Sequence, residues 1–128
     1  MKEQVDERRR TRRAFKDVSL RHWLQAVAER NGASAIVIAD GTGLLVAGGI
    51  EDDEGERMAA TAALQAQEDQ DLTVADDRGT TMLIRRFSWQ QETLYVCVRG
   101  EPERCRAALV EAHDGILRIL EEAAPASP

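Results

Sequence analysis

The stretch that most constrains the fold is residues 34–49, in which two short apolar runs flank a tight turn. Residues 36–38 and 44–46 are strand formers, and Asp40-Gly41 between them supplies the positive-φ positions that a tight hairpin needs. Neither run alternates cleanly between apolar and polar side chains, which predicts strands covered on both faces. We therefore expect a hairpin in the middle of a sheet, with helices packed on it.

Helical and strand patterns alternate along the rest of the chain. Apolar residues spaced three and four apart predict a helix from Ser19 to a stop at Asn31-Gly32, a second helix over residues 54–67 and a third that begins near Pro102. Residues 72–75, 80–89 and 93–99 are predicted as strands. The order αββαβββα predicts an α+β fold, with a five-stranded antiparallel sheet flanked by helices on both faces or mainly on one.

The composition limits the class of protein. The 128 residues suit one domain, and a hydrophobic content of 43% supports a core without metals or disulfides. No apolar run approaches the length of a membrane span, and the charged N-terminus has no apolar signal region. Cys97 and Cys105 form no Cys-x-x-Cys pair, so we expect reduced thiols and a cytoplasmic protein.

The net charge of −6 is unevenly distributed. Residues 1–17 carry seven basic and four acidic side chains, which leaves +3 on this arm and −9 on the remainder. We expect a flexible or helical arm (1–17), a folded domain (18–122) and a disordered tail (123–128). The arm is interpreted as a solvated tail, as an arm that binds nucleic acid or an anionic membrane, or as a contact to an acidic partner; its candidate residues are Arg8, Arg9, Arg10, Arg12 and Arg13. The acidic body would repel phosphate, which favours the solvated tail.

No catalytic constellation stands out in the sequence. It has no Gly-x-Ser-x-Gly, no cluster of metal ligands and no evident Cys/His pair, and Gly41-Thr42-Gly43 precedes a strand instead of the helix that a phosphate loop needs. Cys97 is predicted to be a core or interface residue, His22 a surface residue and His113 a half-buried structural residue with no obvious partner. We expect no catalytic residue, no cofactor and no metal, and therefore no enzyme.

The second predicted helix carries a stripe of small side chains on one face. Its members are Met58, Ala59, Ala62, Ala63 and Ala66. Two interpretations stay open. The stripe packs on the sheet of its own chain, or it permits the close approach of another backbone.

Several of these features occur together in a known family. They are Leu24 and Val27 before Gly32, the apolar runs around Asp40-Gly41, the alanine-rich helix, and Tyr95-Val96-Cys97-Val98 before the last helix. In this order the region from Ser19 to Leu120 resembles the roadblock family, the dynein light-chain and bacterial gliding-regulator group related to longin domains. The Arg-rich arm, the polar connection at residues 68–71 and the Arg85-Arg86 pair depart from the family pattern.

The resemblance implies a homodimer or heterodimer in which the third strand pairs with its counterpart and the second helices lie together on one face of a continuous sheet. It assigns the dimer or partner interface to Met58, Ala59, Ala62, Ala63, Ala66, Leu72 and Val74. Pairing would also cover the edge strand, which otherwise invites aggregation.

Bacterial members of the family regulate small Ras-like GTPases, often as activators. The resemblance therefore implies a non-enzymatic module that binds and regulates such a GTPase, either as an activator or as a scaffold. It carries no arginine finger over to this chain, because Arg57, Arg85 and Arg86 are each expected at the surface. The alternative is an adaptor whose arginine-rich arm binds nucleic acid or another anionic partner.

Overall fold

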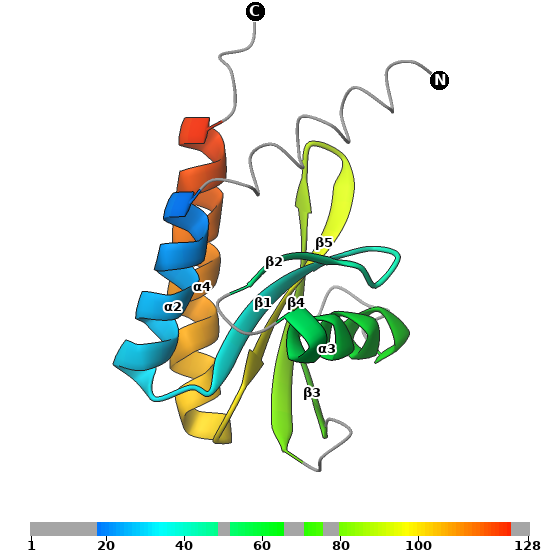
Figure 1. Ribbon diagram of the computed structural model, residues 1–128, viewed down its shortest axis with the longest axis vertical. Helices are drawn as coiled ribbons and strands as arrows, with labels where there is room; N and C mark the ends of the chain where they lie inside the picture. The colour runs from blue at the N-terminus through cyan, green and yellow to red at the C-terminus, as the bar shows by residue number, and fades with distance from the viewer. Residues whose placement is uncertain (1–17, 49–51, 66–70, 76–79, 124–128) are drawn as a thin grey trace, which may run out of the picture.

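A five-stranded antiparallel sheet with helices on both faces forms the body of the protein (Figure 1). The computed structural model describes residues 18–48, 52–65, 71–75 and 80–123. They form, in chain order, α2 (Val18–Asn31), β1 (Ala35–Asp40), β2 (Leu45–Gly48), α3 (Asp52–Gln65), β3 (Leu72–Ala75), β4 (Thr81–Trp89), β5 (Glu92–Arg99) and α4 (Pro102–Ala123). The predicted α+β fold and order of elements are confirmed. The predicted arm and residues 124–128 of the predicted tail lie outside the described residues.

The strand order is β2-β1-β5-β4-β3. β1 pairs with β2 on one side and with β5 on the other, and its residues 35–39 are all buried, as predicted. β2 is half-buried along its length, and β1 is its strand partner within the described residues. Only the first strand of the hairpin is therefore interior. An apolar run indicates that both faces of a strand are covered by helices. It does not indicate how many strands lie beside that strand.

The helices form two different layers. α2 and α4 lie side by side on one face of the sheet, and α3 lies on the other (Figure 1). Alternate strand residues feed two separate cores, because successive side chains of a strand point to opposite faces. The α2/α4 core contains Ile36, Ile38, Leu83, Leu94, Val96 and Val98. The α3 core contains Ala35, Val37, Ala39, Met82, Ile84 and Cys97.

The turn between β1 and β2 is fixed by one carboxylate. Asp40 Oδ1 accepts hydrogen bonds from the backbone N–H of Thr42 at 2.9 Å, from the Thr42 hydroxyl at 2.7 Å and from the N–H of Leu44 at 3.1 Å. Gly43 has a φ of 90°, and a Cβ there would lie 3.1 Å from the Cβ of Ala63 on α3. The turn is therefore structural and packs closely against α3.

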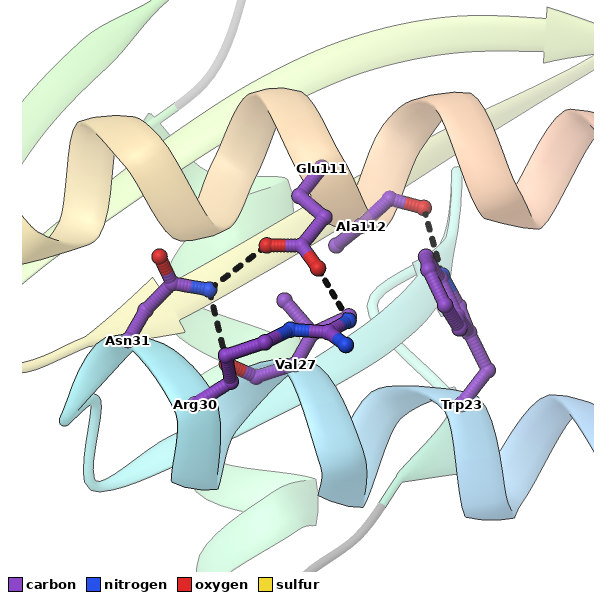
Figure 2. A network of polar contacts seen from close by, with 6 residues as sticks. All are labelled: Trp23, Val27, Arg30, Asn31, Glu111 and Ala112. Atoms are coloured by element: carbon purple, nitrogen blue, oxygen red, sulfur yellow. Dashed lines mark hydrogen bonds and ion pairs between the residues drawn. The ribbon is translucent and has the colours of Figure 1, made fainter.

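Polar contacts join α2 to α4 (Figure 2). Asn31 Nδ2 donates to the Val27 carbonyl oxygen at 2.9 Å and to Glu111 Oε2 at 2.8 Å. The other carboxylate oxygen of Glu111 forms an ion pair with Arg30. Because one carboxylate contacts two residues in the last turn of α2, Glu111 fixes that end of the helix against α4.

Gly115 lies inside α4, where glycine ordinarily weakens a helix. A Cβ at this position would overlap the indole ring of Trp23 on α2. Trp23 Nε1 also donates to the Ala112 carbonyl oxygen at 3.3 Å (Figure 2). Glycine at position 115 therefore makes room for the tryptophan between the two helices.

Replacement of Gly115 with alanine is expected to lower the free energy of unfolding by about 2 kcal/mol, because the new methyl group must displace the Trp23 ring. This loss exceeds the gain of about 1 kcal/mol that alanine brings to a helix interior. In a Trp23→Ala background the same Gly115→Ala change should be neutral or stabilising. Chemical denaturation of the wild type, both single variants and the double variant measures the difference. Equal destabilisation in both backgrounds would contradict the steric explanation.

Candidate interaction site

The outer edge of β3 carries two residues of the predicted interface, Leu72 and Val74. β3 packs mainly against β4, its strand partner within the described residues. Leu72 and Val74 are half-buried, whereas Thr73 and Ala75 are exposed. The register pairs Leu72 with Ile84 and Val74 with Met82, which places both half-buried residues on the face of the sheet that carries α3. We call the strand with these two side chains the β3 edge.

The structure gathers most of the predicted interface residues into one apolar cluster under α3. Met58, Ala59 and Ala62 are buried against the sheet of their own chain, and Ala63 and Val74 are partly buried at the margin of the same cluster. Ala66 lies outside the described residues. The small side chains of α3 thus serve packing within the chain, which was one of the two interpretations. Of the predicted interface residues that the structure describes, Ala63, Leu72 and Val74 are only partly buried within the chain, and their role in an interface stays a prediction.

The first turn of α3 is held to the sheet by an ion pair. Arg99 Nη2, at the end of β5, donates to Glu54 Oε2 at 3.1 Å. Arg99 Nε also donates to the Ser34 hydroxyl at 3.2 Å, and that hydroxyl donates to the Arg99 carbonyl oxygen at 3.0 Å. These contacts fix the helix over β1, β2 and β5, so that β3 extends beyond it.

On the opposite face of the sheet, a bridge of polar side chains joins Asp71, just before β3, to β4 and α4. Arg85 donates from Nε to Asp71 Oδ1 and from Nη2 to Asp71 Oδ2, both at 2.8 Å. Arg85 Nη1 lies 3.2 Å from His113 Nδ1. The hydrogen bonds from Arg85 lower the pKa of the Asp71 carboxyl, and the same contacts raise the pKa of Arg85. Burial, followed by the nearby positive charge of Arg85, lowers the pKa of His113.

Sequence reasoning missed this bridge. His113 was predicted to lack an obvious partner, but Arg85 and Phe87 both contact it. A signal was present, because Asp76-Asp77-Arg78-Gly79 is a turn-forming sequence, and antiparallel pairing of the strands on either side of it brings Asp71 opposite Arg85. The contribution of α4 had no such signal, since the packing of a helix over a strand depends on the tertiary fold.

The three arginines considered as surface residues have different environments. Arg57 is exposed on α3. Arg85 and Arg86 are half-buried, and they point to opposite faces of the sheet because they are neighbours on β4. The guanidinium of Arg85 is already engaged with Asp71 and His113. The arginines of the predicted arm lie outside the described residues.

The buried thiols are in an environment that suppresses ionisation. Cys97 and Cys105 are both buried and unpaired, and burial raises the pKa of each thiol. Within the described ranges, no group of three or more His, Cys, Asp or Glu residues has the arrangement of a metal site. In the same part of the chain, no helix is both long and apolar enough to span a membrane.

Comparison with known proteins agrees with the fold described above. No protein-family model and no curated protein sequence matches the chain. The order of elements and the sheet nevertheless define a roadblock-like α+β fold.

One similar solved structure is described as "MglB with tetrameric arrangement". It superposes with a TM-score of 0.57 at 18% sequence identity, covering 82% of this chain and 90% of that chain. At this identity the likeness supports the fold alone.

Neither cysteine is expected to react with a thiol-specific disulfide reagent in the folded protein at about pH 8, because burial keeps both sulfurs protonated and inaccessible. In denaturant, both thiols of each chain should react at once. The time course of the absorbance change measures both conditions. Rapid reaction of one thiol in the native state would contradict the buried, protonated state of Cys97 or Cys105.

Proposed function

We propose that this chain is a dimeric interaction module that binds and regulates a small Ras-like GTPase in the cytoplasm. The single observation that carries the proposal is the β3 edge, a short outer strand with two half-buried apolar side chains, of which Val74 packs at the margin of the α3 core. An uncovered strand edge is a template for pairing with another chain. The roadblock-like fold supports the choice of partner class, because bacterial roadblock proteins regulate such GTPases.

The dimer proposed here is symmetric. Two copies of β3 pair antiparallel about a twofold axis, so that Leu72 and Val74 of one chain meet the same residues of its partner. The two sheets then form one continuous sheet, with both α3 helices on one face. The description of MglB as having a tetrameric arrangement supports self-association of this fold.

The double change Leu72→Lys and Val74→Lys is expected to raise the dimer dissociation constant at least about tenfold, because charged side chains at a strand edge oppose pairing. Light scattering and sedimentation at micromolar concentrations measure the change. Val110→Lys is the matched control, because Val110 is 49% exposed on α4, on the opposite face of the sheet. A strictly monomeric wild type, or equal loss in the control, would contradict the proposed interface.

Binding to a small Ras-like GTPase from the same genome is expected to depend on its nucleotide. Fluorescence anisotropy with GDP or a non-hydrolysable GTP analogue measures affinity, and release of phosphate measures hydrolysis. Faster hydrolysis indicates an activator, whereas binding without a change in rate indicates a scaffold. The double variant with Leu72→Lys and Val74→Lys should bind more weakly if the dimer forms the docking surface. Absence of binding in both nucleotide states would contradict the proposed function.

The second candidate function is an adaptor that works through residues 8–13, and the net positive charge of residues 1–17 supports it. Deletion of residues 1–17 separates the two functions. If the body carries recognition, the deletion leaves GTPase binding unchanged. If the arm binds nucleic acid, the full chain should bind a DNA duplex with a steep dependence on salt, and the deletion should abolish that binding.

A further inference from the structure

The start of β3 is attached to β4 by side chains as well as by backbone pairing. Leu72 pairs with Ile84, so Asp71 and Arg85 are the next cross-strand partners in the same register. Their two parallel hydrogen bonds, both 2.8 Å long, form a bidentate contact just before β3 begins. Such charge-assisted pairs fix the orientation of both groups. The bridge therefore extends the pairing of a short strand by one position.

His113 of α4 contacts Nη1, the third nitrogen of the same guanidinium. An arginine donates hydrogen bonds and accepts none, so His113 Nδ1, which lies 3.2 Å from Arg85 Nη1, must be the acceptor. The imidazole is then neutral, with its proton on Nε2. Within the described residues Nε2 is buried and has no hydrogen-bond partner. The ring also packs on Phe87, with centroids 5.2 Å apart and a tilt of 51°.

From this geometry we propose that His113 is a proton-sensitive clamp on the β3 edge: the neutral imidazole holds Arg85 against Asp71, and proton uptake by the imidazole releases that hold. Its consequence for dimerisation rests on the proposed function, in which β3 pairs with a second copy of the chain. His113 is a positioning residue in this scheme, because it acts on β3 through Arg85.

The charges around His113 determine the direction of the effect. Arg85 of β4 disfavours the imidazolium, whereas Asp71 before β3 and Asp114 on α4 favour it. Burial and Arg85 prevail, so the pKa of His113 lies below its ordinary value of 6.5. The bridge lowers the pKa of Asp71 below its ordinary value of 3.8, so this carboxyl is mainly ionised above that pH.

The sign of the pH dependence follows from this shift. Because the fold lowers the pKa of His113, the unfolded chain binds the proton more readily than the folded chain. The stabilising contribution is complete above the ordinary value of 6.5 and is lost as the pH falls from there through the folded-state pKa. Acidification therefore loosens the clamp.

Nuclear magnetic resonance on the full chain tests the clamp directly. The chain has two histidines, so the ring signals of His22 and His113 can be followed separately. The Arg85 Nε–H signal shows whether the bridge to Asp71 is formed. Hydrogen exchange of the β3 amides measures how often the strand opens. As the pH falls from about 7.5 through the folded-state pKa of His113, exchange in β3, corrected for its intrinsic pH dependence, should accelerate about fivefold.

Two variants of His113 separate the effect of protonating the imidazole from the effect of losing its hydrogen-bond acceptor. In His113→Asn the amide oxygen replaces Nδ1 as an acceptor but does not titrate, so β3 should stay protected across the pH range. In His113→Leu the acceptor is lost, so exchange in β3 should be about fivefold faster already at neutral pH and should not depend on pH further. The control is His22→Asn, which changes an exposed histidine on α2 and should behave as the wild type.

Three results would overturn the clamp. They are an unchanged Arg85 signal and β3 exchange while His113 titrates, the same pH response in His113→Asn as in the wild type, and a β3 strand that stays protected in His113→Leu. The dimer is measured separately by sedimentation, and its dissociation constant should rise about fivefold on acidification in the wild type but not in His113→Asn. A monomeric wild type would refute the proposed dimer, whereas the Arg85 and β3 signals would still decide whether the clamp exists.

Discussion

β1 and β5 pair from Ala35 and Arg99 at one end to Asp40 and Leu94 at the other, and their central residues are buried on both faces. Each strand contributes alternate side chains to two separate cores, so this pair connects the α2/α4 layer to the α3 layer. The remaining strands are added outward from it, β2 on one side and β4 and then β3 on the other. The burial of β1 and β5 on both faces is therefore the constraint on which the other elements depend.

The two helical layers approach the sheet in different ways. α4 accommodates Trp23 of α2 at Gly115, and Glu111, one turn earlier on α4, ties the same two helices together through Arg30 and Asn31. α3 instead approaches the sheet with alanines and contacts the turn at Gly43. Since α3 packs over β1, β2 and β5, while α4 packs over β4 and β5, β3 lies at the margin of both layers. Within the described residues, β3 therefore has β4 as its one strand partner, and the Asp71–Arg85 bridge adds a side-chain contact to this pairing.

Much of the fold could be predicted because it follows from local patterns. The apolar spacing in α2, the stop at Gly32 and the turn at Asp40 all depend on residues close together in the sequence, and each occurs where expected. The expectation that Asp40-Gly41 supplies the positive φ of the turn was wrong, because that φ falls on Gly43. The alanine stripe had two interpretations because small side chains suit packing both within and between chains. The structure shows Met58, Ala59 and Ala62 in the protomer core, and the part of these residues in a dimer stays a prediction.

The sequence by itself determined the order of the elements, the α+β class and the absence of a recognisable catalytic motif, because these depend on periodicity, turn residues and residue types. Only the tertiary structure decided that β2 lies outside β1, that α3 packs on the face of the sheet opposite α2 and α4, and that His113 contacts Arg85. These features join residues far apart in the chain. Their positions follow from the packing of whole helices on a sheet, which no short stretch of sequence specifies.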